Sequence, residues 1–282
     1  MKLLSTGGWL VVVLSLFLGA CNKPQPGPTA TPSSSSPAAT AATFDHKAFD
    51  ELLATYVNKD GGVDYAGFKT QRAKLDQYLT TLAVANPQNF PNDAERLAFW
   101  INSYNAFTLA DVLDDVLGKA KSVREVKGFF DQKKHKIAGE ELTLDQIEKK
   151  GRDLKDPRIH FAVNCASMSC PKLQPQVYTG AMLDAQLTKV ARAFLADSGR
   201  GLNYLEGKNI VYLSPIFKWY AADFTDTNSV VARLKAEASG EELLDVAKKY
   251  LPAEVAQFFT EKKPKVAYLE YDWSLNSKEN NP

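Results

Sequence analysis

The stretch E-R-L-A-F-W-I-N-S-Y-N-A-F-T-L-A occupies positions 95–110, and its apolar residues fall on nearly every face of a helix. A helix that is apolar all around is buried on most sides, so we expect the fold to form around this element. We expect Asp93 to be the N-cap and the helix to run to about Leu117.

Two amide side chains interrupt this apolar helix. Asn102 and Asn105 are three positions apart and therefore lie on neighbouring surface. A buried amide without a partner costs about 1–3 kcal/mol, so both need hydrogen-bond partners. The partners could be the backbone of a loop, or the amides could line an active site, where they would orient a histidine or donate to an oxyanion.

The remaining periodicity is mostly helical, with few strands. The sequence predicts helices over 44–57, 65–82, 143–150 and 179–196, and short helices between 214 and 259. It predicts a hairpin over 134–142 and strands over 158–164, 209–213 and 266–271. This mixture predicts the α+β class, as a mainly helical single domain with a small β-sheet.

The N-terminus has the pattern of an export signal followed by a linker. An apolar run at 9–18 is too short to span a bilayer, and it ends in L-G-A-C at 18–21. This end resembles the lipobox of bacterial lipoproteins, where the chain is cut before the cysteine and that cysteine is acylated. We therefore expect a signal peptide over 1–20, a lipidated Cys21, and a flexible Pro/Ser/Thr/Ala linker over 21–43. An ordinary secretory signal with an incidental cysteine is the alternative.

A lipid on Cys21 predicts a cell-envelope protein whose membrane partner is reached through that anchor. Asn22 favours the outer membrane, facing the periplasm, if the cell is Gram-negative. The formal net charge of +1 gives no electrostatic case for a nucleic-acid partner, and no motif predicts a cofactor. His46 and His135 lie in polar stretches and are expected to be exposed.

The segment H-F-A-V-N-C-A-S-M-S-C-P at 160–171 contains two of the three cysteines and one of the three histidines. As an extended strand it would hold His160 roughly 16 Å from Cys165, so a direct pair requires the chain to fold back after Asn164. Cys170 precedes Pro171, a residue suited to the first position of a helical turn. An N-cap there would favour a thiolate, so local geometry leans towards Cys170 as the nucleophile.

Three interpretations of this cluster stay open. In an oxidising envelope, Cys165 and Cys170 could form a disulfide in a non-catalytic binding domain. Alternatively, the pair could serve a hydrolase or acyl transferase acting on peptide, amide or envelope bonds, with His160 as the base and Asn102, Asn105 or Asp223 as orienting groups. The third interpretation is a metal site formed by His160 and both cysteines, which would need a further ligand.

We expect the candidate residues to meet around one pocket. Ser167 and Ser169 are small residues that would let the loop backbone approach a ligand closely. The pocket is expected to contain His160, Cys165, Ser167 and Cys170, with Asn102 and Asn105 as its floor.

Another stretch, L-S-P-I-F-K-W-Y-A-A-D-F at 213–224, combines a strong helix start with two aromatic residues and an acid. Trp219 and Tyr220 could form the wall of a groove that binds a peptide or an envelope ligand. Asp223 could orient a histidine, or it could serve only in a cap or an ion pair.

These stretches, with F-W-I-N-S-Y-N-A and the closing Y-D-W-S-L-N, resemble the family known as domain of unknown function 547. The resemblance covers 44–276 and leaves 277–282 as a tail. It implies little about chemistry, because the family has no established activity. Many members read I-E-H where this chain has Ile147-Glu148-Lys149, so the histidine is missing here while Glu148 matches.

Overall fold

The computed structural model describes residues 43–225 and 239–281. The predicted signal peptide, linker and lipidation at Cys21 lie outside the described residues. Within the described part, no helix is both long enough and apolar enough to cross a membrane.

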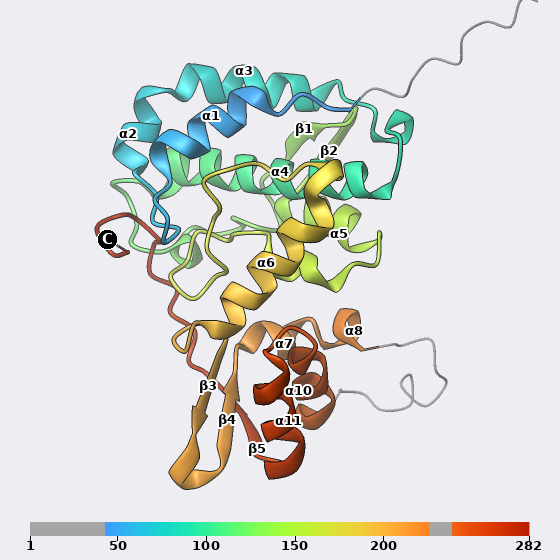
Figure 1. The fold of residues 1–282 in the computed structure, drawn as a ribbon. Helices are drawn as coiled ribbons and strands as arrows, with labels where there is room; N and C mark the ends of the chain where they lie inside the picture. Colours follow the sequence, from blue (N-terminus) through green and yellow to red (C-terminus); the bar gives the residue numbers. More distant parts are fainter. Residues whose placement is uncertain (1–42, 226–238, 282) are drawn as a thin grey trace, which may run out of the picture. The chain divides into compact units, whose positions relative to one another are not determined.

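Helix α4 (Asp93–Asp111) is buried along nearly its whole length, as its sequence predicts, and other helices surround it (Figure 1). Its N-cap is Asn92 rather than Asp93, because the Asn92 side chain accepts a hydrogen bond from the backbone N–H of Glu95 at 2.9 Å. The helix continues as a π-helical stretch, Val112–Val116, close to the predicted end.

Helix α3 (Arg72–Ala83) packs against α4. Around α3 lie α1 (Lys47–Tyr56), which also contacts α2 (Tyr65–Thr70), and a hairpin of the antiparallel strands β1 (His135–Ile137) and β2 (Glu140–Leu142). The hairpin confirms the prediction. The single helix predicted over 65–82 is wrong, because the backbone leaves the helical conformation at Gln71 and divides it in two.

Helix α5 (Leu144–Arg152) begins with a capping box formed by Thr143 and Gln146. The strand predicted after it is wrong, because Pro157–Phe161 is a 3-10 helix. Asp156 caps this turn by accepting from the N–H of Arg158, and a proline at the first position stabilises it.

The C-terminal part combines helices with a three-stranded sheet. It contains α6 (Leu183–Ala196), β3 (Leu202–Leu205), β4 (Ile210–Leu213), α7 (Pro215–Trp219), α8 (Ala221–Phe224), α10 (Gly240–Lys248), α11 (Ala253–Lys262) and β5 (Lys265–Tyr268). Strand β4 pairs antiparallel with β3 and parallel with β5, and α7, α10 and α11 lie along this sheet (Figure 1). The predicted α+β class is confirmed, with two small sheets in the described residues rather than one.

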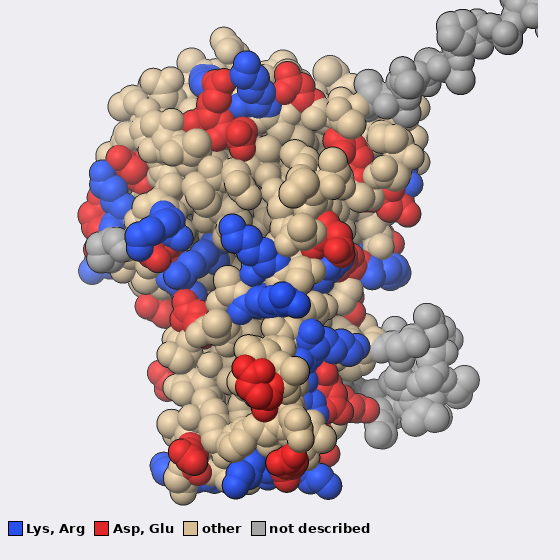
Figure 2. All heavy atoms as spheres, viewed as in Figure 1, with Lys and Arg blue, Asp and Glu red and all other residues tan. Residues whose placement is uncertain are grey.

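The last described residues are bonded to the loop between α1 and α2. The N–H of Lys278 donates to the carbonyl oxygen of Val63, and Asn281 bonds to both Asn58 and Asp60. On the face drawn in Figure 2, basic and acidic side chains are both spread widely, in keeping with the formal net charge of +1.

Candidate functional site

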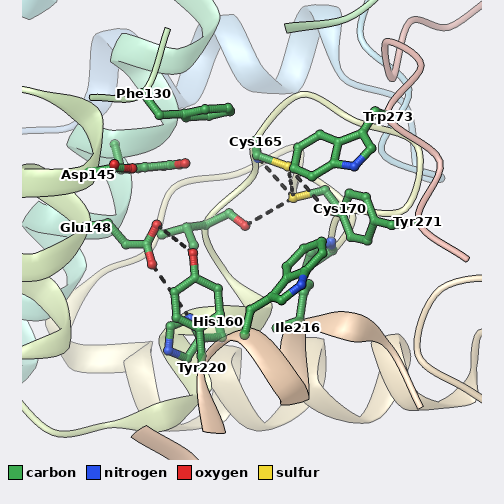
Figure 3. A pocket seen from close by; sticks show the side chains of 14 residues that line it. Phe130, Asp145, Glu148, His160, Cys165, Cys170, Ile216, Tyr220, Tyr271 and Trp273 are labelled. Carbon is green, nitrogen blue, oxygen red and sulfur yellow. Dashed lines mark hydrogen bonds and ion pairs between the residues drawn. The ribbon is translucent and has the colours of Figure 1, made fainter. Parts of the chain in front are cut away.

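The loop from Asn164 to Pro171 is closed by one side chain. Asn164 donates from Nδ2 to the carbonyl oxygen of Pro171 at 2.8 Å, and its Oδ1 accepts from the N–H of Ala166 at 2.9 Å. Ala166 adopts a left-handed backbone conformation with φ of 63°, so the chain turns back at this point. The turn brings Cys165 and Cys170 side by side (Figure 3).

The segment 271–276 runs against this loop. The N–H of Met168 donates to the carbonyl oxygen of Ser274 at 2.9 Å. Ser169 is bonded twice to Asp272, once through its N–H at 3.1 Å and once through Oγ, which accepts from the N–H of Asp272 at 2.9 Å. Ser169 therefore holds the C-terminal segment in place, and this pairing sets Tyr271 beside the two sulfurs.

Cys165 Sγ is surrounded by possible hydrogen-bond donors. It lies 2.9 Å from Cys170 Sγ, 3.1 Å from Ser167 Oγ and 3.3 Å from Tyr271 Oη. Burial alone would raise the pKa of Cys165, but hydrogen bonds from Cys170, Ser167 and Tyr271 outweigh it and lower this pKa to about 7.

The pKa of the second thiol, Cys170, is shifted in the opposite direction. Burial and the interaction with Cys165 raise the pKa of Cys170 well above its ordinary value. Cys165 is therefore the more acidic thiol of the pair, the reverse of the order favoured by N-cap geometry. That geometry is absent because residues 171–174 form no helix. Both cysteines are free, so the structure holds no disulfide between them.

The two amides of α4 bond to loop backbone. Asn102 donates to the carbonyl oxygen of Tyr178 at 2.7 Å and accepts from its N–H at 2.9 Å. Asn105 donates to the carbonyl oxygen of Ala162 at 3.1 Å and accepts from the N–H of Asn164 at 2.8 Å. They position the loop that carries the cysteines, and the expectation that they form the pocket floor is wrong.

His160 lies between two carboxylates. Its Nε2 is 2.8 Å from Asp223 Oδ2, and its Nδ1 is 3.8 Å from Glu148 Oε1. The ring of Tyr220 stacks on the imidazole with 3.9 Å between centroids. Asp223 also accepts from Arg152 Nε at 2.5 Å.

These contacts assign the proton on the imidazole. Burial would raise the pKa of Asp223, but the hydrogen bonds from His160 and Arg152 outweigh it and hold this pKa well below its usual range. Burial also lowers the pKa of His160 despite its carboxylate partner. We therefore assign a neutral His160 with its proton on Nε2, donated to an ionised Asp223.

Glu148 is a functional candidate that residue spacing alone did not select. Its side chain belongs to the buried face of α5, and burial raises its pKa to about 7. Oε2 accepts from Tyr220 Oη at 3.5 Å, whereas Oε1 is buried without a hydrogen-bond partner. Two features of the sequence could have indicated it: Glu148 falls on the same helix face as the apolar residues Leu144 and Ile147, and it matches the family motif.

These groups line one pocket of about 220 Å³ (Figure 3). Of the predicted site residues, the pocket wall contains His160, Cys165, Cys170, Trp219 and Tyr220. Ser167 contacts the Cys165 sulfur without being part of that wall, and Asp223 lines a neighbouring cavity. Sequence reasoning missed wall residues that include Tyr104, Phe130, Asp145, Tyr271 and Trp273.

Within residues 43–225 and 239–281, no group of three or more His, Cys, Asp or Glu side chains is arranged to hold a metal ion. The metal interpretation through His160, Cys165 and Cys170 therefore has no ligand cluster to support it in this part of the chain.

A family model described as "Protein of unknown function, DUF547" matches residues 87–195. The chain therefore contains a segment of this family. The match includes α4, α5 and the cysteine loop, but it ends before Trp219 and Tyr271, so the DUF547 segment supplies only part of the pocket wall. The comparisons found no match among curated proteins or solved structures.

Proposed function

We propose that this DUF547 protein is a thiol-dependent hydrolase or acyl transferase whose nucleophile is Cys165. The observation that carries the proposal is a pocket thiol that has three hydrogen-bonding groups within 3.3 Å and a pKa of about 7. A thiolate of this kind is populated at neutral pH and remains nucleophilic. Its sulfur would attack the acyl carbon and expel the leaving group, which forms a thioester.

Glu148 is the proton-transfer group in this proposal, because it faces the cysteines across the pocket (Figure 3) and its pKa of about 7 lets it give and take a proton at neutral pH. It would protonate the leaving amine or alcohol. It would then take a proton from the water or acceptor that attacks the thioester and regenerates the Cys165 thiolate.

His160 acts on Glu148 rather than on the sulfur in this scheme. Among the described residues no hydrogen bond joins His160 to either cysteine, and its Nε2 is bound to Asp223. The unprotonated Nδ1 faces Glu148 Oε1 at 3.8 Å and could accept from the protonated acid. The general-base role expected of His160 therefore passes to Glu148, and the Asp223–His160 pair becomes its positioning group.

We further propose an envelope location for this chemistry. The lipobox-like L-G-A-C and the Pro/Ser/Thr/Ala linker support a lipid anchor on Cys21 with the enzyme tethered to a membrane, at the outer membrane in a Gram-negative cell. Peptide, amide or other envelope bonds are then the substrate class. Intact mass measurement of the membrane-fraction protein tests the anchor: an N-terminal acylated Cys21 is expected, and an unmodified Cys21 or another cut contradicts it.

The test of the nucleophile is the pH dependence of iodoacetamide labelling in the folded protein without reductant. We expect one thioether on Cys165, with a rate that rises through a midpoint near pH 7. Cys165→Ser should abolish this labelling, whereas Cys170→Ser should retain it because a serine hydroxyl still donates to the thiolate. A midpoint near the ordinary pKa of about 8.5 for a free cysteine contradicts the proposal.

A second function is favoured by the short distance between the two sulfurs, which lie 2.9 Å apart. Oxidation to a Cys165–Cys170 disulfide would leave a non-catalytic domain that binds its ligand at the aromatic wall, where Trp219 is half exposed. Absence of labelling until reductant is added would support this function against the first.

A further inference from the structure

The pocket that contains Cys165 has a one-sided charge pattern. Its lining includes two acids, Asp145 and Glu148, and no lysine or arginine. Six of its lining residues are aromatic: Tyr104, Phe130, Trp219, Tyr220, Tyr271 and Trp273. Aromatic faces and carboxylates both attract a cation, and both disfavour an anion.

Asp145 stands at the accessible end of this pocket. Its side chain is exposed, and its carboxylate has no hydrogen-bond or ion-pair partner among the described residues. Figure 3 shows it beneath the ring of Phe130, on the same wall as Glu148 and opposite the cysteines. Asp131 adds to the negative potential at Asp145, and the charge of nearby Arg152 is matched by Asp223.

A second observation points to a ligand deeper in the same pocket. Glu148 is only 6% exposed, and its Oε1 has no hydrogen-bond partner. A buried polar atom left unpaired costs about 1–3 kcal/mol, and a ligand that donates a hydrogen bond would remove this cost. On the wall opposite the thiols, Glu148 Oε1 is therefore an acceptor without a donor, and a ligand N–H group would supply one.

We propose that the substrate carries a protonated amine, which Asp145 and the surrounding aromatic rings hold while the acyl carbon faces Cys165. The inference rests on the proposed function and specifies its substrate class: an amino-acyl compound or an amine-bearing peptide, rather than a carboxylate or phosphate ester. In such a substrate the ammonium group fixes the orientation, and the carbonyl lies between the thiolate and Glu148.

The test compares three alkylating reagents that differ in charge: 2-bromoethylamine (cationic), iodoacetamide (neutral) and iodoacetate (anionic). Each rate of thioether formation at Cys165 is divided by the rate of the same reagent with free 2-mercaptoethanol, which removes intrinsic reactivity. We expect the normalised rate to be highest for the cationic reagent, intermediate for the neutral one and lowest for the anionic one. The cation-to-neutral ratio should be about three- to tenfold, as one unit charge near a water-accessible site gives.

Asp145→Asn is the diagnostic variant, because it removes the charge and keeps the shape. The cation-to-neutral ratio should fall towards one in it, whereas Asp153→Asn, an equal charge change just after α5 and outside the pocket, should preserve the ratio. Equal normalised rates for the three reagents in the unmodified protein would overturn the amine proposal while leaving Cys165 as a nucleophile. Failure of iodoacetamide to reach Cys165 would overturn the proposed function instead.

Discussion

Two buried histidines in this protein have almost the same surroundings. His160 is bound to Asp223, which also accepts from Arg152, and an aromatic ring of Tyr220 covers the imidazole. His135 has the corresponding set: Nε2 lies 3.0 Å from Asp111, Asp111 is paired with Lys133, and Phe107 lies against the ring at 4.5 Å between centroids. Pairing and burial alone therefore do not distinguish a functional histidine from a structural one.

The difference lies on the other side of each imidazole. Nδ1 of His160 faces Glu148 in the wall of the thiol pocket, whereas His135 is not part of that wall. Lys133 beside His135 is bound to Asp115 as well as to Asp111, at 2.6 and 2.7 Å, so that cluster joins the hairpin to the end of α4. We infer that the His160 set serves chemistry and the His135 set serves stability.

The largest expected effect is the loss of thioester hydrolysis in a variant of Glu148, the acid that faces His160 and not His135. In Glu148→Gln, acylation of Cys165 by p-nitrophenyl acetate should still release a burst of nitrophenolate, because that leaving group needs no proton. Hydrolysis of the resulting thioester should fall by about 10²-fold or more, since the general base is lost. An unchanged turnover after the burst would contradict the role of Glu148.

The same variant should lose activity but gain stability at alkaline pH. The folded pKa of Glu148 is raised to about 7, so the folded state binds more protons than the unfolded chain between pH 4.5 and 7. The free energy of unfolding therefore falls as the pH rises through this window, by roughly 3 kcal/mol in total. Urea unfolding should show Glu148→Gln to be more stable than the parent at pH 8 and nearly equal to it at pH 4.5.

The second effect belongs to the His135 set. Asp111→Asn removes the carboxylate that Lys133 and His135 share, and its side chain is only 2% exposed. Lys133 stays partly exposed and paired with Asp115, so the loss is that of a hydrogen bond to a charged group, and the free energy of unfolding should fall by about 1–3 kcal/mol. The midpoint of Cys165 alkylation should stay near pH 7, and a shift of that midpoint would show that the two sets are coupled.

Much of the fold could be predicted because α4 is apolar on every face and the hairpin carries a glycine at its turn. The strand predicted over 158–164 is wrong for a physical reason. The hydrophobic pattern of a short apolar run does not distinguish a strand from a helix, and here the Asp156 cap and Pro157 at the first position favour a 3-10 helix. His46 and His135 lie in polar stretches, yet both are buried, because Tyr78 and Asp111 provide polar partners from distant positions.

The site was predictable only where its residues are close in sequence. Cys165 and Cys170 could be selected from one twelve-residue segment, but Tyr271 reaches the same sulfur from 106 positions away through a backbone pairing. Glu148 could not be ranked either, since its burial and its unpartnered oxygen follow from how α5 packs against the rest of the chain. Long-range packing determined which of the charged residues acquired perturbed pKa values.

The smallest expected effect concerns the wall of the pocket opposite Glu148. Tyr271→Phe removes one hydroxyl that lies 3.3 Å from Cys165 Sγ and keeps the ring beside Trp219 and Trp273. Losing a donor destabilises the thiolate, so the midpoint of Cys165 alkylation should rise by about 0.5 to 1 pH unit, as a single hydrogen bond warrants. Tyr204→Phe, whose hydroxyl bonds to Asn209 far along the chain from both cysteines, is the matched control and should leave the midpoint unchanged. If Tyr271→Phe also left it unchanged, Cys170 and Ser167 alone would stabilise the thiolate, and the C-terminal segment would serve only to shape the pocket.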